Sequence, residues 1–163
     1  MNTRNNAVLF EFTSGHHAAI GLHEVAELVL SPKLIPVPLA PDYCHSLCIW
    51  QDHAIPFVEL APLIGQRSLD KIQLALVVTY FTRPNGEQRW GALGLSAYFR
   101  TVSVSDDAAC LLPQDSSAWP SIAHSCFQLV DENVPILNLD ALFEQRLELF
   151  SSSLSDLKNR SEN

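Results

Sequence analysis

Short apolar runs separated by turn-forming residues make up most of the chain. The runs are rich in Val, Ile, Leu and Phe, and apolar and polar positions mostly alternate, which is typical of half-buried β-strands. Strands are predicted over residues 7–12, 18–22, 47–50, 55–60, 74–81, 90–95, 101–104, 125–130 and 134–139. Ten prolines interrupt the chain too often for a helical bundle. The pattern predicts an all-β fold.

Two turn signals add detail to this pattern. Asn85-Gly86 lies between the runs 74–81 and 90–95, and Asn-Gly readily adopts positive φ angles in tight hairpins, so these runs should pair antiparallel. Four prolines fall between Pro32 and Pro41. Because proline lacks the backbone donor of a sheet ladder, an edge strand or a loop is expected there.

Helix is predicted in few places. Residues 23–30 fit a short helix, although Val25 and Val29 also suit a strand. Near the C-terminus, apolar residues recur at spacings of three and four, at Leu139, Leu142, Phe143, Leu147, Phe150, Leu154 and Leu157. This spacing predicts a helix that packs across the rest of the molecule. Residues 1–150 are expected to form one domain, and residues 151–163 the helix end and a frayed tail.

The sequence contains an internal repeat. A shift of 79 residues places His45 on His124, Pro56 on Pro135 and Leu60 on Leu139. Upstream the shift is smaller, at 73 for residues 20–22 against 93–95 and 77 for residues 34–36 against 111–113. A duplicated unit with small insertions would produce this relation. The repeat predicts two similar all-β halves, each a small barrel.

Composition and charge narrow the classes of function. Apolar residues make up 47% of the chain and charged residues 17%, as expected of a folded core. A net charge of −8 argues against a nucleic-acid partner, which requires a basic surface. The longest apolar stretch, residues 74–81, is far shorter than the roughly 20 residues of a membrane span. No signal peptide is recognisable, so a cytoplasmic protein without membrane insertion is expected.

A cluster of thiols and imidazoles raises the question of a zinc site. The potential donors are Cys44, His45, Cys48 and His53. The repeat places Ala123, Phe127 and Glu132 opposite three of them, and no second C-x(2–4)-C pair is present. In a strand, Cys48 would also face away from Leu47. No metal is therefore expected.

Candidate catalytic groups are scattered. Histidines precede an acidic residue at His23-Glu24 and a hydroxyl at His124-Ser125, but neighbours on a strand point in opposite directions and form no dyad by themselves. The chain has no glycine-rich phosphate loop and no nucleophile elbow. We expect no catalytic residue and no cofactor. An enzyme or small-molecule sensor that uses the histidines is the alternative from another class.

The segment APDYCHSLCIWQDHAIPFVELAPLIG, residues 40–65, resembles the CheW-like domain, the adaptor of bacterial chemosensory arrays. That family has the pattern A-P-x-Y-x-x-G-φ-φ-N-L-R-G-x-φ-φ-P-φ-φ-D-L. The residues in register are Ala40, Pro41, Tyr43, Pro56 and Leu60, with Glu59 in place of the Asp. Residues 25–28 look like the family's V-x-E-φ, and the resemblance extends over roughly residues 7–150. It implies two intertwined SH3-like five-stranded β-barrels followed by a C-terminal helix.

The resemblance weakens at one place. Where the family has Gly, Asn, Arg and Gly, this chain has Ser46, Ile49, Gln51 and Asp52. The family's arginine is associated with binding receptor or kinase, and a neutral amide cannot replace a charged, bidentate donor. Aspartate tolerates left-handed turn conformations, so Asp52 suits a turn. The fold should be retained and the binding chemistry at this tip altered.

The resemblance also implies a function. It predicts a non-catalytic adaptor that couples the cytoplasmic tip of a chemoreceptor to the regulatory domain of a CheA-type histidine kinase, recruited to membrane-associated arrays. Val25 and Glu27 occupy the family's receptor-contact position, and the altered tip comprises Ile49, Trp50, Gln51 and Asp52. The alternative is a diverged paralogue, for example of a pilus or twitching-motility system, that has lost standard coupling and binds another protein. Whether Trp50 is exposed or packed is left open.

Overall fold

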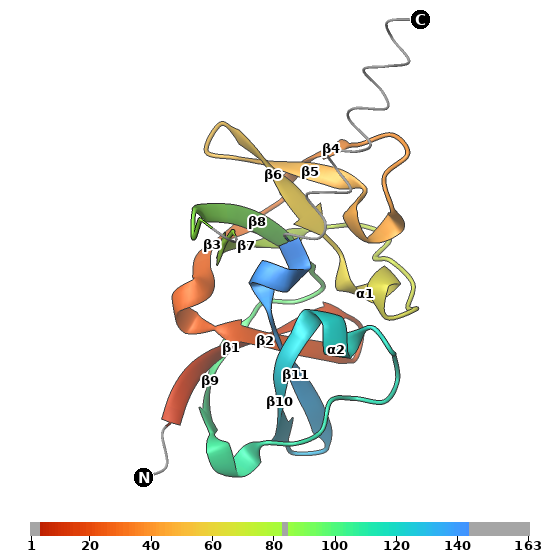
Figure 1. Cartoon of the computed structure of the whole chain (residues 1–163). Coiled ribbons are helices and arrows are strands. Elements are labelled where there is room, and N and C mark those ends of the chain that lie inside the picture. The colour runs from red at the N-terminus through yellow and green to blue at the C-terminus, as the bar shows by residue number, and fades with distance from the viewer. Residues whose placement is uncertain (1–3, 83–84, 144–163) are drawn as a thin grey trace, which may run out of the picture.

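A computed structural model describes residues 4–82 and 85–143 of the chain, and strands dominate it (Figure 1). The strands are β1 (Arg4–Thr13), β2 (His16–Gly21), β3 (Val25–Leu30), β4 (Lys33–Pro36), β5 (Ser46–Trp50), β6 (His53–Val58), β7 (Leu74–Phe81), β8 (Gln88–Leu95), β9 (Arg100–Ser105), β10 (Ala123–Leu129) and β11 (Glu132–Leu137). Short helical turns connect them: η1 (Leu22–Glu24), η2 (Asp42–Cys44), α1 (Leu60–Leu63), η3 (Asp106–Ala108) and α2 (Trp119–Ile122). The all-β prediction is confirmed.

The strands form two curled sheets, one above the other in Figure 1. The five-stranded sheet has the order β10-β11-β2-β1-β9, and the six-stranded sheet has the order β3-β7-β8-β6-β5-β4. The sequence had predicted five strands in each. The sixth is β4, which pairs only with β5 at the edge of its sheet, a position that tolerates its one proline, Pro36.

Two local predictions need correction. Residues 23–30 contain only the short turn η1 and then strand β3, because this segment pairs along β7 instead of coiling. The predicted strand 55–60 ends earlier, at Val58, and Leu60 begins α1. The predicted hairpin between β7 and β8 is confirmed, with Phe81 opposite Gln88.

The internal repeat is visible in the pairing register. In the hairpin β5–β6, Pro56 lies opposite Leu47. In the hairpin β10–β11, Pro135 lies opposite Cys126. Each residue of the second pair follows its counterpart in the first pair by 79 positions. The upstream alignment was off by two, however. The pair Leu34 and Cys48 corresponds to the isolated bridge Ala109–Phe127, so Leu34 matches Ala109 and not Leu111.

The two halves exchange strands. In the six-stranded sheet β3 pairs with β7, and β6 runs parallel to β8, so two strands of the second half lie between strands of the first. The five-stranded sheet repeats this arrangement, with β9 against β1 and β11 parallel to β2. The intertwined architecture is therefore confirmed, and neither half forms a sheet from its own strands alone.

The main hydrophobic core lies between the sheets, and each sheet also has a smaller cluster of its own. Residues 139–143 are helical and cross from β11 to the six-stranded sheet. There Phe143 stacks on Tyr80 of β7, with ring centroids 5.0 Å apart, and Asp140 accepts a hydrogen bond from Phe81 N–H. The start of the predicted C-terminal helix is thus confirmed.

The remainder of that helix and the predicted frayed tail, residues 144–163, lie outside the described residues. The division into a domain of residues 1–150 and a tail of residues 151–163 therefore stays a prediction. Among the described helices, none is long and apolar enough to cross a membrane.

Candidate functional site

The hairpin tip between β5 and β6 is a tight turn with both central residues in left-handed conformation. Gln51 has φ 47° and Asp52 has φ 63°, and the strands pair up to Trp50 opposite His53. Positive φ at both positions is the geometry of a type I′ hairpin turn, whose twist matches that of the flanking strands. Both side chains are exposed. The predicted turn is confirmed, including the tolerance of aspartate for this conformation.

Trp50 lies at the end of the six-stranded sheet and is half-buried. It packs against the small cluster inside that sheet, and its ring lies 6.0 Å from that of Trp90 on β8. Its indole N–H donates a hydrogen bond to the carboxylate of Glu27 on β3. Three strands therefore converge on one tryptophan, and the question left open by the sequence is answered: Trp50 is packed, with part of its surface accessible.

Val25 and Glu27 do not face the same side of β3. A β-bulge separates them, since Val25 lies opposite Val78 whereas Glu27 lies opposite the very next residue, Val77. Val25 consequently packs against the main core between the sheets, while the exposed Glu27 points toward Trp50. Without the bulge, two residues at this spacing would share a face. The structure brings Glu27 to the hairpin tip and leaves Val25 on another face.

Ile49 is the remaining predicted contact residue. It is half-buried and lies between Lys33 on β4 and Ala54 on β6. Residues directly opposite one another in a sheet share a face, so these three side chains lie together on the side opposite to Trp50.

Four of the six predicted contact residues lie together with one that sequence reasoning missed, whereas Val25 and Ile49 lie on other faces. We define the tip surface as Glu27, Trp50, Gln51, Asp52 and Trp90. Trp90 is 38% exposed although it is one of the largest apolar side chains. The sequence shows only a tryptophan beside charged and polar residues at the start of a strand. Alternation of apolar and polar residues does not decide which face of the sheet such a tryptophan occupies. Aromatic side chains that are partly exposed are frequent binding anchors.

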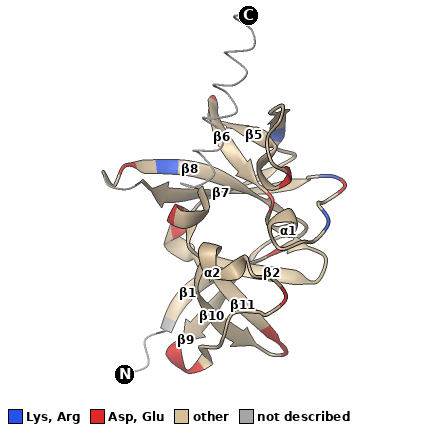
Figure 2. Ribbon diagram, turned by 45° about the vertical axis from the view of Figure 1, so that its right-hand side comes forward, with Lys and Arg blue, Asp and Glu red and all other residues tan. Residues whose placement is uncertain are grey.

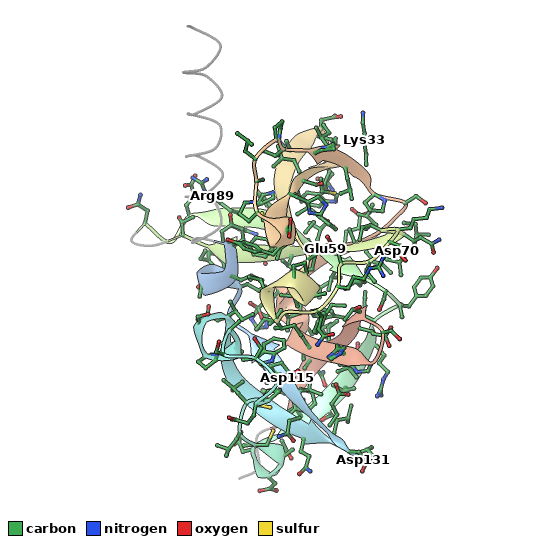
Figure 3. All side chains as sticks on the ribbon, turned by 90° about the vertical axis from the view of Figure 1, so that its right-hand side faces the viewer. Lys33, Glu59, Asp70, Arg89, Asp115 and Asp131 are labelled. Atoms are coloured by element: carbon green, nitrogen blue, oxygen red, sulfur yellow. The ribbon has the colours of Figure 1, made fainter. Side chains whose placement is uncertain are left out.

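Charge is distributed unevenly around this surface. The basic residues Lys33 and Arg89 lie on β4 and β8 of the six-stranded sheet and appear to the right and left of it in Figure 3. Arg89 also forms an exposed ion pair with Glu87 at 3.1 Å. On the five-stranded half, η3 and the β10–β11 turn carry Asp106, Asp107 and Asp131 (Figure 2). The end of the molecule with the tip surface is thus less acidic than the opposite end.

A buried carboxylate supports the base of the same hairpin. Glu59, which takes the place of the family's aspartate, is only 4% exposed, and its Oε1 has no hydrogen-bond partner among the described residues. Its other oxygen lies 3.6 Å from Nδ1 of His45, and its backbone N–H donates to Tyr43 O. Burial raises the pKa of Glu59 above the ordinary value, and the nearby His45, the backbone N–H of Leu69 and the Ser68 hydroxyl partly offset that rise.

The four candidate zinc donors do not converge. Cys44 points into the main core, and Cys48 into the separate cluster of the six-stranded sheet. His45 is instead close to Glu59, and His53 is exposed in the turn. Within the described part of the chain, no three His, Cys, Asp or Glu side chains are arranged to hold a metal ion.

The expectation for His124 and Ser125 was wrong in one respect. Their side chains do not point apart: Ser125 Oγ lies 3.0 Å from His124 Nδ1. A β-bulge between Ala123 and Ser125 breaks the alternation at this point. Both residues are exposed and line a groove of about 730 Å³ together with His23 and Glu24.

Comparisons with known proteins agree with this architecture. The sequence profile of the CheW-like domain matches residues 7–147. The fold is similar to that of the scaffolding protein TtCheW from Thermoanaerobacter tengcongensis, with a TM-score of 0.68 and 15% sequence identity over 87% of this chain and 94% of that one. A search of curated proteins finds no match. On the profile match, which covers most of its length, the chain belongs to the CheW-like domain family.

Proposed function

We propose that the protein is a non-catalytic adaptor that couples a chemoreceptor to the regulatory domain of a CheA-type histidine kinase within a bacterial chemosensory array. Membership of the CheW-like family supports a scaffold role in general. The description of TtCheW as a scaffolding protein agrees with it. The adaptor would work in the cytoplasm, at arrays assembled on membrane-bound receptors.

The tip surface is the observation that carries the proposal. It lies at the end of the β5–β6 hairpin, and it combines two partly exposed aromatic rings with the amide of Gln51 and the charge of Asp52. Such a surface offers a protein partner apolar contact at its centre and polar contact at its edge. It lies at the position where the family has its arginine. We assign kinase or receptor contact to this surface, and receptor contact also to the face around Val25.

A second candidate is favoured by the chemistry of the same tip. Gln51 and Asp52 supply no positive charge, so a partner that pairs with the family's arginine would lose a charge-assisted hydrogen bond here. A diverged adaptor would bind its own partner through Trp50 and Trp90 instead. A pilus or twitching-motility system is one setting in which such an adaptor would act.

Binding to purified partners tests the proposal. The full chain is titrated by calorimetry with the regulatory domain of the CheA-type kinase encoded in the same genome, and with a cytoplasmic fragment of a receptor. We expect binding to at least one of them, and we expect Trp90→Ala to weaken it at least fivefold, since aromatic anchors typically contribute ~1 kcal/mol or more.

The matched control is Asp70→Ala. Asp70 is exposed in the loop between α1 and β7, where it pairs only weakly with Arg67, at 3.5 Å. It should leave affinity unchanged. If neither kinase nor receptor binds, while a pull-down from the native bacterium recovers a different protein through Trp90, the diverged adaptor is the correct reading.

A further inference from the structure

Two thiols meet on the five-stranded half of the molecule. The Sγ atoms of Cys110 and Cys126 lie 2.9 Å apart. Cys126 is buried in β10, whereas Cys110 is partly exposed in the segment between η3 and α2, residues 109–118, which we name the connector. Neither residue belongs to the tip surface. Cys44 and Cys48 lie in two different hydrophobic clusters and provide an internal comparison.

Few backbone contacts hold the connector beside β10. Cys110 N–H donates to Cys126 O at 3.1 Å, and the neighbouring Ala109 and Phe127 form an isolated antiparallel bridge. In the six-stranded sheet the corresponding segment is the full strand β4, which pairs with β5 from Lys33 to Pro36. The two cysteines thus face each other where the other half has a regular ladder. Opposed side chains on antiparallel chains are close enough to react.

We propose that Cys110 and Cys126 form an oxidant-sensitive site that reduces a peroxide and becomes an intramolecular disulfide. The Cys110 sulfur attacks one oxygen of hydrogen peroxide, the O–O bond breaks, and one water leaves as Cys110 becomes a sulfenic acid. The Cys126 sulfur then attacks the Cys110 sulfur, the S–O bond breaks, and the second water leaves with the proton of Cys126. Two thiols are oxidised and one peroxide is reduced to two waters.

The order of the two steps follows from exposure and acidity. Cys110 is the thiol that solvent reaches. Burial and the adjacent Cys110 thiol raise the pKa of Cys126 to about 12, so Cys126 stays protonated at neutral pH and is a poor first nucleophile. It then lies next to the sulfenic acid and resolves it without a large movement of the backbone.

The disulfide would fix one wall of a groove. The connector residues Pro113 and Asp115 line a groove of about 400 Å³, and Asp131 and Asn133 of the adjacent hairpin line the other side. Asn133 already donates a hydrogen bond to Leu111 O at 3.2 Å. A covalent bond between Cys110 and β10 would add a second attachment of the connector to the hairpin. Oxidation would therefore restrict the shape of this groove without touching the tip surface.

Mass spectrometry of the full chain tests the proposal. The reduced protein is treated with hydrogen peroxide, denatured and alkylated with iodoacetamide. We expect two of the four cysteines to escape alkylation and a peptide map to join Cys110 to Cys126. Closing a loop of this length should raise the Tm by roughly 5–10 °C, and dithiothreitol should reverse the shift.

Variants separate this reaction from general thiol oxidation. Cys110→Ser should abolish both the crosslink and the shift in Tm. Cys126→Ala should abolish them as well, and it leaves the exposed thiol of Cys110 in place. A variant with Cys44→Ser and Cys48→Ala should still form the disulfide. Four alkylated cysteines after peroxide treatment, a crosslink through Cys44 or Cys48, or a bond between two chains would overturn the proposal.

Discussion

At the scale of single residues, Trp50 has two roles that the sequence could not separate. Its ring closes one end of the six-stranded sheet and contacts Trp90, and its N–H is satisfied by Glu27. Trp50 lies on the same face of β5 as the buried Cys48, but the sequence left open whether its ring is exposed or packed. The partnership with Glu27 had no sequence signal, because it depends on the bulge that turns Glu27 away from the face of Val25.

Trp50→Ala should therefore destabilise the fold as well as weaken partner binding. Truncating a half-buried tryptophan should lower the free energy of unfolding by about 2 kcal/mol, less than the 3–5 kcal/mol of a fully buried aromatic residue. Urea denaturation measures the loss. The more exposed Trp90→Ala is the comparison and should cost no more than about half as much. Equal stability of Trp50→Ala and the unaltered protein would show that the indole is not part of the packing.

A double substitution in the β5–β6 turn should increase the affinity for a standard kinase partner. Gln51→Arg combined with Asp52→Gly restores the family's Arg-Gly and suits the positive φ of 63° at position 52. Affinity for the regulatory domain of a standard CheA-type kinase should rise about tenfold, because a charge-assisted bond is gained and the charge of Asp52 is removed. Calorimetry gives the two affinities. Asp52→Gly alone controls for the turn. If the unaltered protein already binds the standard kinase as tightly as other family members do, the tip is not the contact.

Glu59 makes stability depend on pH. Its pKa is raised by burial, so the folded state holds the proton more tightly than the unfolded state. The stability that this group contributes is therefore present below the ordinary glutamate pKa of 4.5 and is lost as pH rises through the folded-state pKa. Glu59→Gln should raise the free energy of unfolding at pH 7 by about 1 kcal/mol, because a neutral amide avoids the cost of burying a negative charge.

The advantage of Glu59→Gln should shrink toward pH 4, where the carboxyl of the original protein is protonated. Chemical denaturation at pH 4, 5, 6 and 7 follows it. The exposed Glu87→Gln serves as the control and should change stability little across this range. A loss of stability in Glu59→Gln at pH 7 would mean that the ion pair with His45, at 3.6 Å, outweighs the burial of the charge.

At the scale of elements, alternation located the strands well but not always their ends. Glu59 is the only polar residue between Pro56 and Leu60, and a strand tolerates a single polar position, so the pattern does not mark the change from β6 to α1. For residues 23–30, valines are compatible with both strand and helix, and pairing with β7 decides for a strand. The proline-rich segment was assigned to an edge or loop for a sound physical reason, and it became edge strand β4.

The contact between the C-terminal segment and β8 can be tested through a glycine. A Cβ at Gly91 would overlap the ring of Phe143, which is held against Tyr80. Gly91→Ala should lower the free energy of unfolding by roughly 2 kcal/mol, because it overpacks a tight site. Thermal and urea denaturation measure this loss.

A second substitution shows whether the clash is the cause. Combining Gly91→Ala with Phe143→Leu removes the ring edge that the new methyl meets. The double variant should then be more stable than the sum of the two single losses predicts. Additive losses would place the effect of Gly91→Ala in the backbone of β8 and not in its contact with residue 143.

At the scale of the whole molecule, the repeat predicted two halves, and periodicity could not tell which half each strand would pair with. Pairing across halves depends on contacts far apart in sequence, and no local pattern records them. The resemblance to the CheW-like family supplied the intertwined arrangement, and β3 with β7 and β9 with β1 confirm it. The resemblance also directed attention to the hairpin tip, whose role as a contact surface stays a prediction, and it gave no sign of Trp90 or of the bulge in β3.

Cutting the chain in the loop between α1 and β7 tests this exchange. A fragment of residues 1–68 lacks the central strands β7 and β8, and a fragment of residues 69–163 lacks β1 and β2. Neither should show the cooperative unfolding of the intact protein by circular dichroism. Expressed together, they should form a 1:1 complex with native-like spectra. A fragment that folds alone as a monomer would contradict the exchange.

The exchange of strands also bears on symmetry. Two separate copies of one unit would close both sheets only as a two-fold dimer, and such a dimer has two identical ends. Because both units are in one chain, their ends are free to differ, and they do. One hairpin ends in the polar pair Gln51-Asp52, and the other in Val130-Asp131, where Val130 is 86% exposed in a left-handed conformation. An adaptor of the kind proposed, which would hold two unlike proteins at once, would need that asymmetry.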